Sequence, residues 1–282
     1  MSRPLGLTTK IFIDTGDPNE TRQAIEKIGF LDGQTTNPSL VAKLRAGEEK
    51  LTRQQALDFY KEHIKEVSSI IPEGSVSIEV YADMSTTKDD MIAQAHELNT
   101  WIPNAHIKLP LTHEGLSAAR VLLDEGIRLN ITLCFSQEQA MGVFKALENA
   151  KEGQVFLSPF VGRLDDKGLN GMDLIANIVR MKQETNSNVE ILSASVRTIE
   201  HFMYAIKLGS NIITSPYKII EQWAQEGMKL PDEDFVYSTE LQPIEYQHLD
   251  ISKSWEEYNI THELTDTGIK KFVEDWNAML SE

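Results

Sequence analysis

Short runs of apolar and β-branched residues recur along the first 220 residues, with room for a helix between each run and the next. Runs of this length are typical of buried strands, and such long connections are typical of parallel strand–helix units. Eight strands, each followed by a helix, favour an α/β fold of the closed (β/α)8 TIM barrel type over an open doubly wound sheet. The eight runs are 11–15, 33–37, 75–81, 106–110, 129–135, 155–161, 190–196 and 211–217.

Helix start signals lie between these runs. Asp17 and Pro18 have the character of an N-cap and a first-turn proline ahead of a helix over 21–28. Ser136 and Gln139 have the spacing of a capping box, and they predict a helix that continues over 140–150. These signals support the alternation of strands and helices.

The last fifth of the chain follows a different pattern. The stretch 229–259 is polar, irregular and rich in aromatic residues, whereas 268–280 has the apolar spacing of an amphipathic helix. We therefore divide the chain into a barrel domain, 1–228, and a C-terminal extension, 229–282, formed by an acidic insertion and a helix. That helix packs either on its own barrel or on a neighbouring subunit, through Ile269, Phe272, Val273, Trp276 and Leu280.

Composition and charge narrow the function classes. Hydrophobic residues make up 41% of the 282 residues and charged residues 25%, which is ordinary for a globular protein. The formal net charge is −16, and residues 221–282 hold 15 acidic residues against 4 basic ones. Because an acidic chain without a basic stripe does not attract phosphate backbones, we expect no nucleic-acid partner. No apolar stretch reaches the ~18 residues of a membrane span, so we expect no membrane partner.

Cysteine and histidine usage bears on compartment and cofactors. Cys134 is the only cysteine, so it cannot form an internal disulfide, and without a histidine partner it is interpreted as a packing residue. The first ten residues lack the apolar run of a signal peptide, and we expect a soluble cytoplasmic protein. The seven histidines have no metal-ligand spacing and no glycine-rich nucleotide loop is present, so we expect neither a metal nor another cofactor.

Polar side chains stand near the carboxyl ends of the predicted strands, the face that carries the active site in characterised barrels. Lys108 is the most informative, because alternation along His-Ile-Lys-Leu-Pro turns its side chain into the barrel. Burial lowers the pKa of an amine, which allows it to attack a carbonyl and form a Schiff base. The alternative is a strand-end lysine that reaches water or pairs with a carboxylate. The candidates are Asp14, Asn37, Glu79, Lys108, Asn130, Thr132, Ser158, Arg163, Ser195, Arg197, Thr214 and Ser215.

Two carboxylates and two arginines accompany this lysine. Asp14 and Glu79, on the first and third strands, are near enough across such a barrel to share a pocket with Lys108 and to move protons during Schiff-base chemistry. Alternatively, one of them only neutralises the lysine. Arg163 and Arg197 follow the sixth and seventh strands, where a guanidinium fork can hold a phosphate, although arginines are also common on barrel surfaces.

Read as strings, these segments resemble the transaldolase family. The resemblance covers about residues 10–220, and 264–276 is similar to the C-terminal helix of shorter members. It implies a homo-oligomer, whose size is left open because 229–259 has no counterpart. The seven blocks, in order, are Ile-Phe-Ile-Asp-Thr at 11–15, Thr-Thr-Asn-Pro-Ser-Leu at 35–40, Ser-Ile-Glu-Val at 77–80, Ile-Lys-Leu-Pro at 107–110, Asn-Ile-Thr-Leu-Cys-Phe-Ser at 130–136, Ser-Pro-Phe-Val-Gly-Arg at 158–163 and Ser-Ala-Ser-Val-Arg at 193–197.

The resemblance implies a role for each candidate. Lys108 would be the Schiff-base lysine, and Asp14 the acid/base at the substrate C4 hydroxyl. Glu79 and Thr132 would move protons through a water during imine formation and hydrolysis. The implied reaction transfers a dihydroxyacetone unit from sedoheptulose 7-phosphate or fructose 6-phosphate to glyceraldehyde 3-phosphate or erythrose 4-phosphate, in the non-oxidative pentose phosphate pathway. The remaining residues would bind sugar hydroxyls or phosphate: Asn37, Asn130, Ser158 and Ser195 the hydroxyls, Arg163 and Arg197 the phosphate.

Two other functions remain open. The related fructose-6-phosphate aldolases use the same scaffold but release free dihydroxyacetone. In that group a glutamine tends to replace Glu79 and a tyrosine tends to replace Phe160, a further substrate-binding candidate, so both residues here favour the transferase. The second alternative is a sugar-phosphate-binding barrel without turnover, against which the intact set of candidate residues argues.

Overall fold

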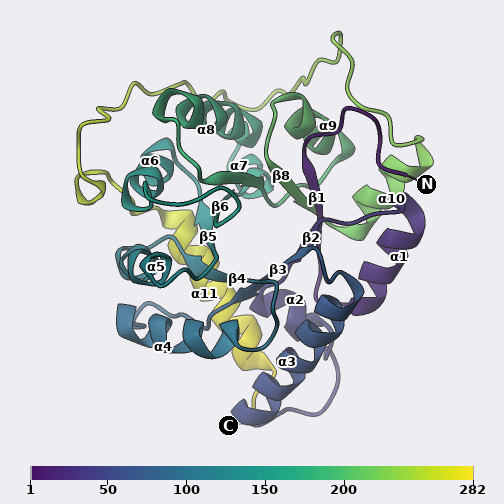
Figure 1. The fold of residues 1–282 in the computed structure, drawn as a ribbon, viewed down its shortest axis with the longest axis vertical. Coiled ribbons are helices and arrows are strands. Elements are labelled where there is room, and N and C mark those ends of the chain that lie inside the picture. Colours follow the sequence, from purple (N-terminus) through teal and green to yellow (C-terminus); the bar gives the residue numbers. More distant parts are fainter. Residues whose placement is uncertain (1, 282) are drawn as a thin grey trace.

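Eight parallel strands pair in sequence order and close into a barrel in the computed structural model, which describes residues 2–281 (Figure 1). The ring is complete because the last strand pairs with the first. The predicted (β/α)8 barrel is therefore confirmed. The strands are β1 (Lys10–Asp14), β2 (Gly33–Thr35), β3 (Ser75–Glu79), β4 (Ala105–Pro110), β5 (Leu129–Cys134), β6 (Val155–Pro159), β7 (Glu190–Ser193) and β8 (Ile212–Ser215).

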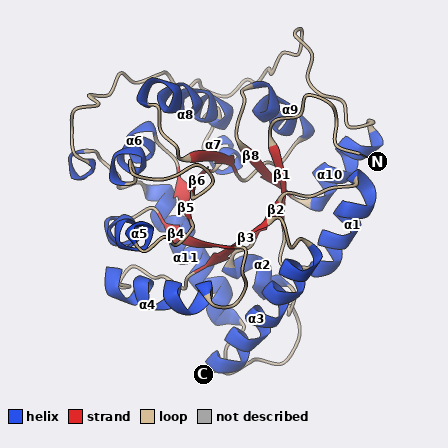
Figure 2. Cartoon of the chain, viewed as in Figure 1, coloured by secondary structure: helices blue, strands red, loops and turns tan. Residues whose placement is uncertain are grey.

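Helices surround this ring and connect successive strands (Figure 2). No helix within residues 2–281 is both long and apolar enough to cross a membrane. The helices are α1 (Pro18–Ile28), α2 (Pro38–Lys43), α3 (Arg53–Ile70), α4 (Lys88–Asn99), α5 (His113–Asp124), α6 (Gln137–Ala146), α7 (Val161–Asp165), α8 (Gly171–Thr185), α9 (Ile199–Lys207), α10 (Tyr217–Gln225), the 3-10 turn η1 (Trp255–Glu257) and α11 (Glu263–Ala278).

The predicted helix starts at 17 and 136 are confirmed. The Asp17 carboxylate accepts the Asn19 N–H of α1 at 2.8 Å, and the Ser136 hydroxyl accepts the Gln139 N–H of α6 at 3.1 Å. The Gln139 side chain does not close a capping box, because it accepts the Phe135 N–H instead. Helix α6 also ends at residue 146 rather than 150.

Several strands end sooner than the apolar runs predict. Strand β2 ends at Thr35 rather than at 37, because the Asn37 side chain caps α2 by accepting the Leu40 N–H at 2.9 Å. Strand β6 ends at Pro159, and α7 already begins at Val161. The runs predicted over 75–81, 190–196 and 211–217 end at 79, 193 and 215. Polar residues after these ends therefore lie in loops and short helices at the barrel mouth.

The C-terminal extension first passes along the outside of the barrel. Figure 1 shows it running from α10 past α9, α8 and α6 before α11 begins. Backbone hydrogen bonds connect Gln242 to Gly168 and Asn170, and the Tyr246 ring lies 3.7 Å from the Arg180 guanidinium. These contacts hold the stretch against α8.

Helix α11 then packs on the carboxyl ends of its own strands. It begins at 263 rather than at 268 and contacts α2 and β5. The Thr265 hydroxyl donates to the Leu133 carbonyl at 2.9 Å, which fixes the start of α11 on β5. Ile269, Phe272 and Trp276 of the predicted stripe are buried. The division after residue 228 remains our proposal, and its outermost residues, 1 and 282, lie outside the described part.

Candidate active site

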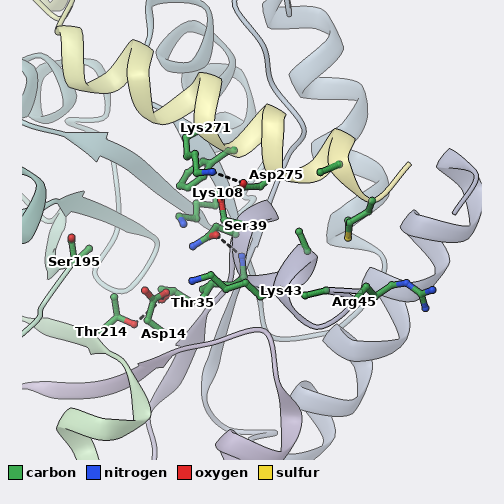
Figure 3. Close-up of a pocket in the computed structure, with 18 of the residues that line it drawn as sticks. Asp14, Thr35, Ser39, Lys43, Arg45, Lys108, Ser195, Thr214, Lys271 and Asp275 are labelled. Carbon is green, nitrogen blue, oxygen red and sulfur yellow. Dashed lines mark hydrogen bonds and ion pairs between the residues drawn. The ribbon is translucent and has the colours of Figure 1, made fainter. Parts of the chain in front are cut away.

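A cavity of about 680 Å³ lies at the carboxyl ends of the strands, bordered by α2 and α11 (Figure 3). This is the end of the barrel where the sequence predicts the site. Asn130, Thr132, Glu79, Arg197 and Ser215 do not line it. Eight predicted residues do: Asp14, Asn37, Lys108, Ser158, Phe160, Arg163, Ser195 and Thr214.

Lys108 lies at the bottom of the site. The residue is 3% exposed, so the alternative of a lysine that reaches bulk water is wrong, whereas the other alternative, pairing with a carboxylate, is what the structure shows. The Nζ atom lies 2.9 Å from Oε2 of Glu79, and it donates a hydrogen bond to the Thr36 carbonyl at 3.1 Å. Burial raises the pKa of Glu79, and the nearby Lys108 ammonium opposes that rise. The lysine is therefore desolvated, held by one hydrogen bond and one ion pair, and accessible from the cavity.

Asp14 lies on the cavity wall beside Thr35 and Thr214 (Figure 3). It accepts the Thr35 hydroxyl at 2.7 Å, and the Thr35 and Thr214 hydroxyl oxygens are 2.6 Å apart. Thr35 has one hydroxyl hydrogen and gives it to Asp14, so Thr214 must be the donor to Thr35. Burial raises the pKa of Asp14, opposed by Lys108 and, more weakly, by Lys43. The carboxyl is thus oriented by hydroxyls and faced by cations.

Asn130 and Ser158 form a buried polar chain inside the barrel. The Ser158 hydroxyl donates to the side-chain oxygen of Asn130 at 2.6 Å, and the side-chain NH2 of Asn130 donates to the Ser77 hydroxyl at 3.0 Å. Thr132 is fully buried, and its hydroxyl has no hydrogen-bond partner within residues 2–281. It precedes Leu133, whose φ of 63° marks the bulge in β5. An unpaired buried hydroxyl at this place can bind a water or a substrate atom.

The two predicted phosphate-binding arginines differ in placement. The Arg163 guanidinium lines the cavity 5.2 Å from the Phe160 ring and 5.4 Å from the Phe272 ring, and burial lowers its pKa. A Cβ at Gly268 of α11 would lie 2.5 Å from this guanidinium, so a larger residue there would require the Arg163 side chain to shift. Arg197 instead binds both carboxylate oxygens of Asp166, with Nη2 at 2.7 Å from Oδ2.

The cavity also has polar residues that the sequence analysis missed. Lys43 of α2 faces Asp14, and Ser39 of α2 donates to Asp275 of α11. The Ser39–Asp275 contact joins α2 to α11 beside the cavity, and Asp275 also accepts from Lys271 of its own helix at 2.7 Å. The apolar spacing of 268–280 identifies only the buried side of α11. Which residues lie next to its polar side depends on how the helix packs on the barrel.

Within residues 2–281, no three or more His, Cys, Asp or Glu side chains are arranged so that they could bind a metal ion. The fold and the site define a (β/α)8 barrel with a buried lysine–carboxylate pair at the mouth of its strands and a second carboxylate and an arginine around the same cavity. Such a set suits covalent chemistry on an anionic carbonyl compound.

Comparison with known proteins gives the family. Residues 11–282 match the family described as Transaldolase/Fructose-6-phosphate aldolase. A probable transaldolase of Clostridium perfringens is 38% identical over 273 residues, covering 97% of this chain and all of the relative. A probable transaldolase of Dehalococcoides mccartyi is 34% identical over 270 residues, covering 96% of this chain and 99% of the relative. The chain therefore belongs to the transaldolase/fructose-6-phosphate aldolase family, as its sequence blocks indicate.

Proposed function

We propose that this protein is a transaldolase of the non-oxidative pentose phosphate pathway, working in the cytoplasm through a Schiff base on Lys108. The donor is a ketose phosphate, sedoheptulose 7-phosphate or fructose 6-phosphate. The acceptor is an aldose phosphate, glyceraldehyde 3-phosphate or erythrose 4-phosphate. The observation that carries the proposal is the buried Lys108 amine, 2.9 Å from Glu79 and open to the cavity that Asp14 lines. Family membership and the names of the relatives support the reaction class.

The proposed chemistry begins with attack of the Lys108 amine on the C2 carbonyl of the ketose. Water leaves and a protonated imine forms, for which Glu79 supplies and removes protons, assisted by the unpaired hydroxyl of Thr132. Asp14 then takes the proton of the C4 hydroxyl, and the C3–C4 electrons move into the imine. An aldose phosphate leaves, and a three-carbon enamine stays on the lysine. The acceptor aldehyde reverses these steps, and water finally releases the new ketose.

Borohydride trapping tests this proposal. Reduction in the presence of fructose 6-phosphate should attach a three-carbon adduct to Lys108, because the imine left after cleavage is reduced to a stable amine. Peptide mass mapping locates the adduct. Lys43 lines the same cavity but is exposed, and it serves as an internal control that should stay unmodified. An unmodified Lys108 peptide would refute the proposed function.

The family also includes fructose-6-phosphate aldolases, so release of free dihydroxyacetone is the alternative reaction. Glu79 and Phe160 favour transfer, and Phe160 lines the cavity beside Arg163. The two reactions separate when dihydroxyacetone is measured with no acceptor present. We expect slow release of dihydroxyacetone without an acceptor, and transfer in its place once erythrose 4-phosphate is added. Release at the full turnover rate without an acceptor would show an aldolase.

The geometry of Arg197 leads to a prediction on phosphate binding. We propose that both arginines hold the substrate phosphate, so the phosphate must compete with Asp166 for the fork of Arg197. Asp166→Asn should therefore lower KM for fructose 6-phosphate about threefold, and Arg197→Ala should raise it about tenfold. Steady-state kinetics with fructose 6-phosphate and with unphosphorylated fructose check this. Equal effects on both sugars would contradict a phosphate-binding role.

A further inference from the structure

The hydrogen-bond ladder between β2 and β3 is interrupted beside Lys108. Its last bond runs from the Thr36 N–H to the Ser77 carbonyl at 3.3 Å. In a regular parallel ladder, the next bond would run from the Glu79 N–H to the Thr36 carbonyl. Here the Glu79 N–H instead donates to the Tyr60 hydroxyl at 3.1 Å, and the Thr36 carbonyl accepts Nζ of Lys108. A side chain of α3 thus replaces one bond of the barrel.

The hydroxyl groups around Tyr60 form a chain with one possible direction. Thr36 donates its hydroxyl hydrogen to the Ser77 carbonyl at 2.9 Å. A hydroxyl has a single hydrogen, so in the 2.8 Å contact between Thr36 and Tyr60 the tyrosine must be the donor. Tyr60 therefore uses its hydrogen toward Thr36 and a lone pair toward the Glu79 N–H. Burial raises the pKa of Tyr60, which keeps this donor protonated.

Aromatic packing keeps the Tyr60 ring in place. The residue is 3% exposed, and its ring meets Trp101 edge-on at 5.7 Å between centroids and Trp276 at 6.1 Å. Trp276 belongs to α11, so the C-terminal helix packs on the same tyrosine ring. Two rings from different elements leave the tyrosine little rotational freedom.

We propose that Tyr60 is a positioning residue for Lys108: by occupying the Glu79 N–H, it leaves the Thr36 carbonyl free to orient the amine. Without the Tyr60 hydroxyl, the buried Glu79 N–H would lack an acceptor. The Thr36 carbonyl is the acceptor that a regular ladder supplies, and turning toward Glu79 would take it from Lys108. The lysine would then keep Glu79 as its partner but lose the second contact that fixes its direction. This inference rests on the proposed role of Lys108.

The test replaces Tyr60 by phenylalanine, which keeps the ring and removes the hydroxyl. Tyr60 does not line the cavity, so KM for fructose 6-phosphate should change less than about twofold. The kcat value and the rate of borohydride trapping at Lys108 should fall about tenfold, because a misdirected amine reaches the carbonyl less often. The matched control is Tyr258→Phe. That buried hydroxyl donates to the Asp250 carbonyl at 2.6 Å and is part of the C-terminal extension.

The outcomes separate the two proposals. Failure of the wild-type protein to trap at Lys108 would count against the proposed function itself. If the wild-type protein traps and Tyr60→Phe matches it in kcat and trapping rate, the positioning role is wrong. If Tyr60→Phe does not fold, Thr36→Val provides a second route. It removes the acceptor of the Tyr60 hydrogen, so the hydroxyl is no longer held with its lone pair toward the Glu79 N–H. It should show the same loss of kcat at unchanged KM, while Tyr258→Phe lowers thermal stability alone.

Discussion

Replacing Lys108 by methionine should lower the rate of transfer by about four orders of magnitude or more. Methionine has a similar length and fills the same space, but it cannot form the covalent imine on which both half-reactions depend. Substrate binding should persist, because the cavity walls and Arg163 are unchanged. A coupled assay measures the loss of turnover, and calorimetry measures binding of fructose 6-phosphate. Residual turnover above about a hundredth of the wild-type rate would contradict a covalent role for Lys108.

The same variant should also change the pH dependence of stability. Without Lys108, Glu79 has no cation at 2.9 Å, and burial then raises its pKa further. For a carboxyl whose folded pKa exceeds its unfolded value, stability is greatest below the unfolded pKa and falls as pH rises through the folded one. We therefore expect Lys108→Met to lose about 3 kcal/mol at pH 8 and much less at pH 5. Adding Glu79→Gln should remove this pH dependence in thermal unfolding, whereas an unchanged slope would show that Glu79 is not its source.

The barrel could be predicted from the sequence because short runs, most of them apolar, recur with a long connection behind each run. The ends of the strands could not be placed this way. Asn37 directly follows the strand residues in the sequence, yet its side chain caps α2 and β2 ends at Thr35. Val161 is apolar and buried like a strand residue, but it begins α7. Apolar character reports burial, and a buried residue at the barrel mouth can belong to a helix as easily as to a strand.

For some candidate residues, strand alternation alone decides the direction of the side chain. Lys108 and Asp14 are of this kind, since parallel strands in a ring bring their carboxyl ends together. Arg197 is different, because its direction depends on Asp166 in a separate loop. Tyr60 was missed for a related reason. It lies on the buried side of α3, where a tyrosine looks like core, and its hydroxyl gains a role only through the missing bond between β2 and β3.

Asp14→Asn should lower kcat about 10³-fold while leaving imine formation intact. The asparagine carbonyl oxygen can still accept the Thr35 hydroxyl, so the local geometry is kept, but no group remains to take the proton of the C4 hydroxyl. Borohydride should then trap the uncleaved six-carbon phosphosugar on Lys108 in place of the three-carbon adduct. Peptide mass distinguishes the two. Asp275→Asn, at another cavity carboxylate, is the matched control and should still give the three-carbon adduct.

The pH profile gives an independent measure of Asp14. Burial holds its pKa above the ordinary aspartate value of 3.8, while Lys108, Lys43 and Arg163 limit the rise and Glu79 is the nearby carboxyl that titrates with it. A general base acts only when ionised, so wild-type kcat should fall on the acid side at a pH above that of a free aspartate. Asp14→Asn should lose this acid limb together with the rate. A three-carbon adduct in Asp14→Asn, or an acid limb that survives the substitution, would assign cleavage to another base, and the buried Glu79 beside Lys108 would be the next candidate.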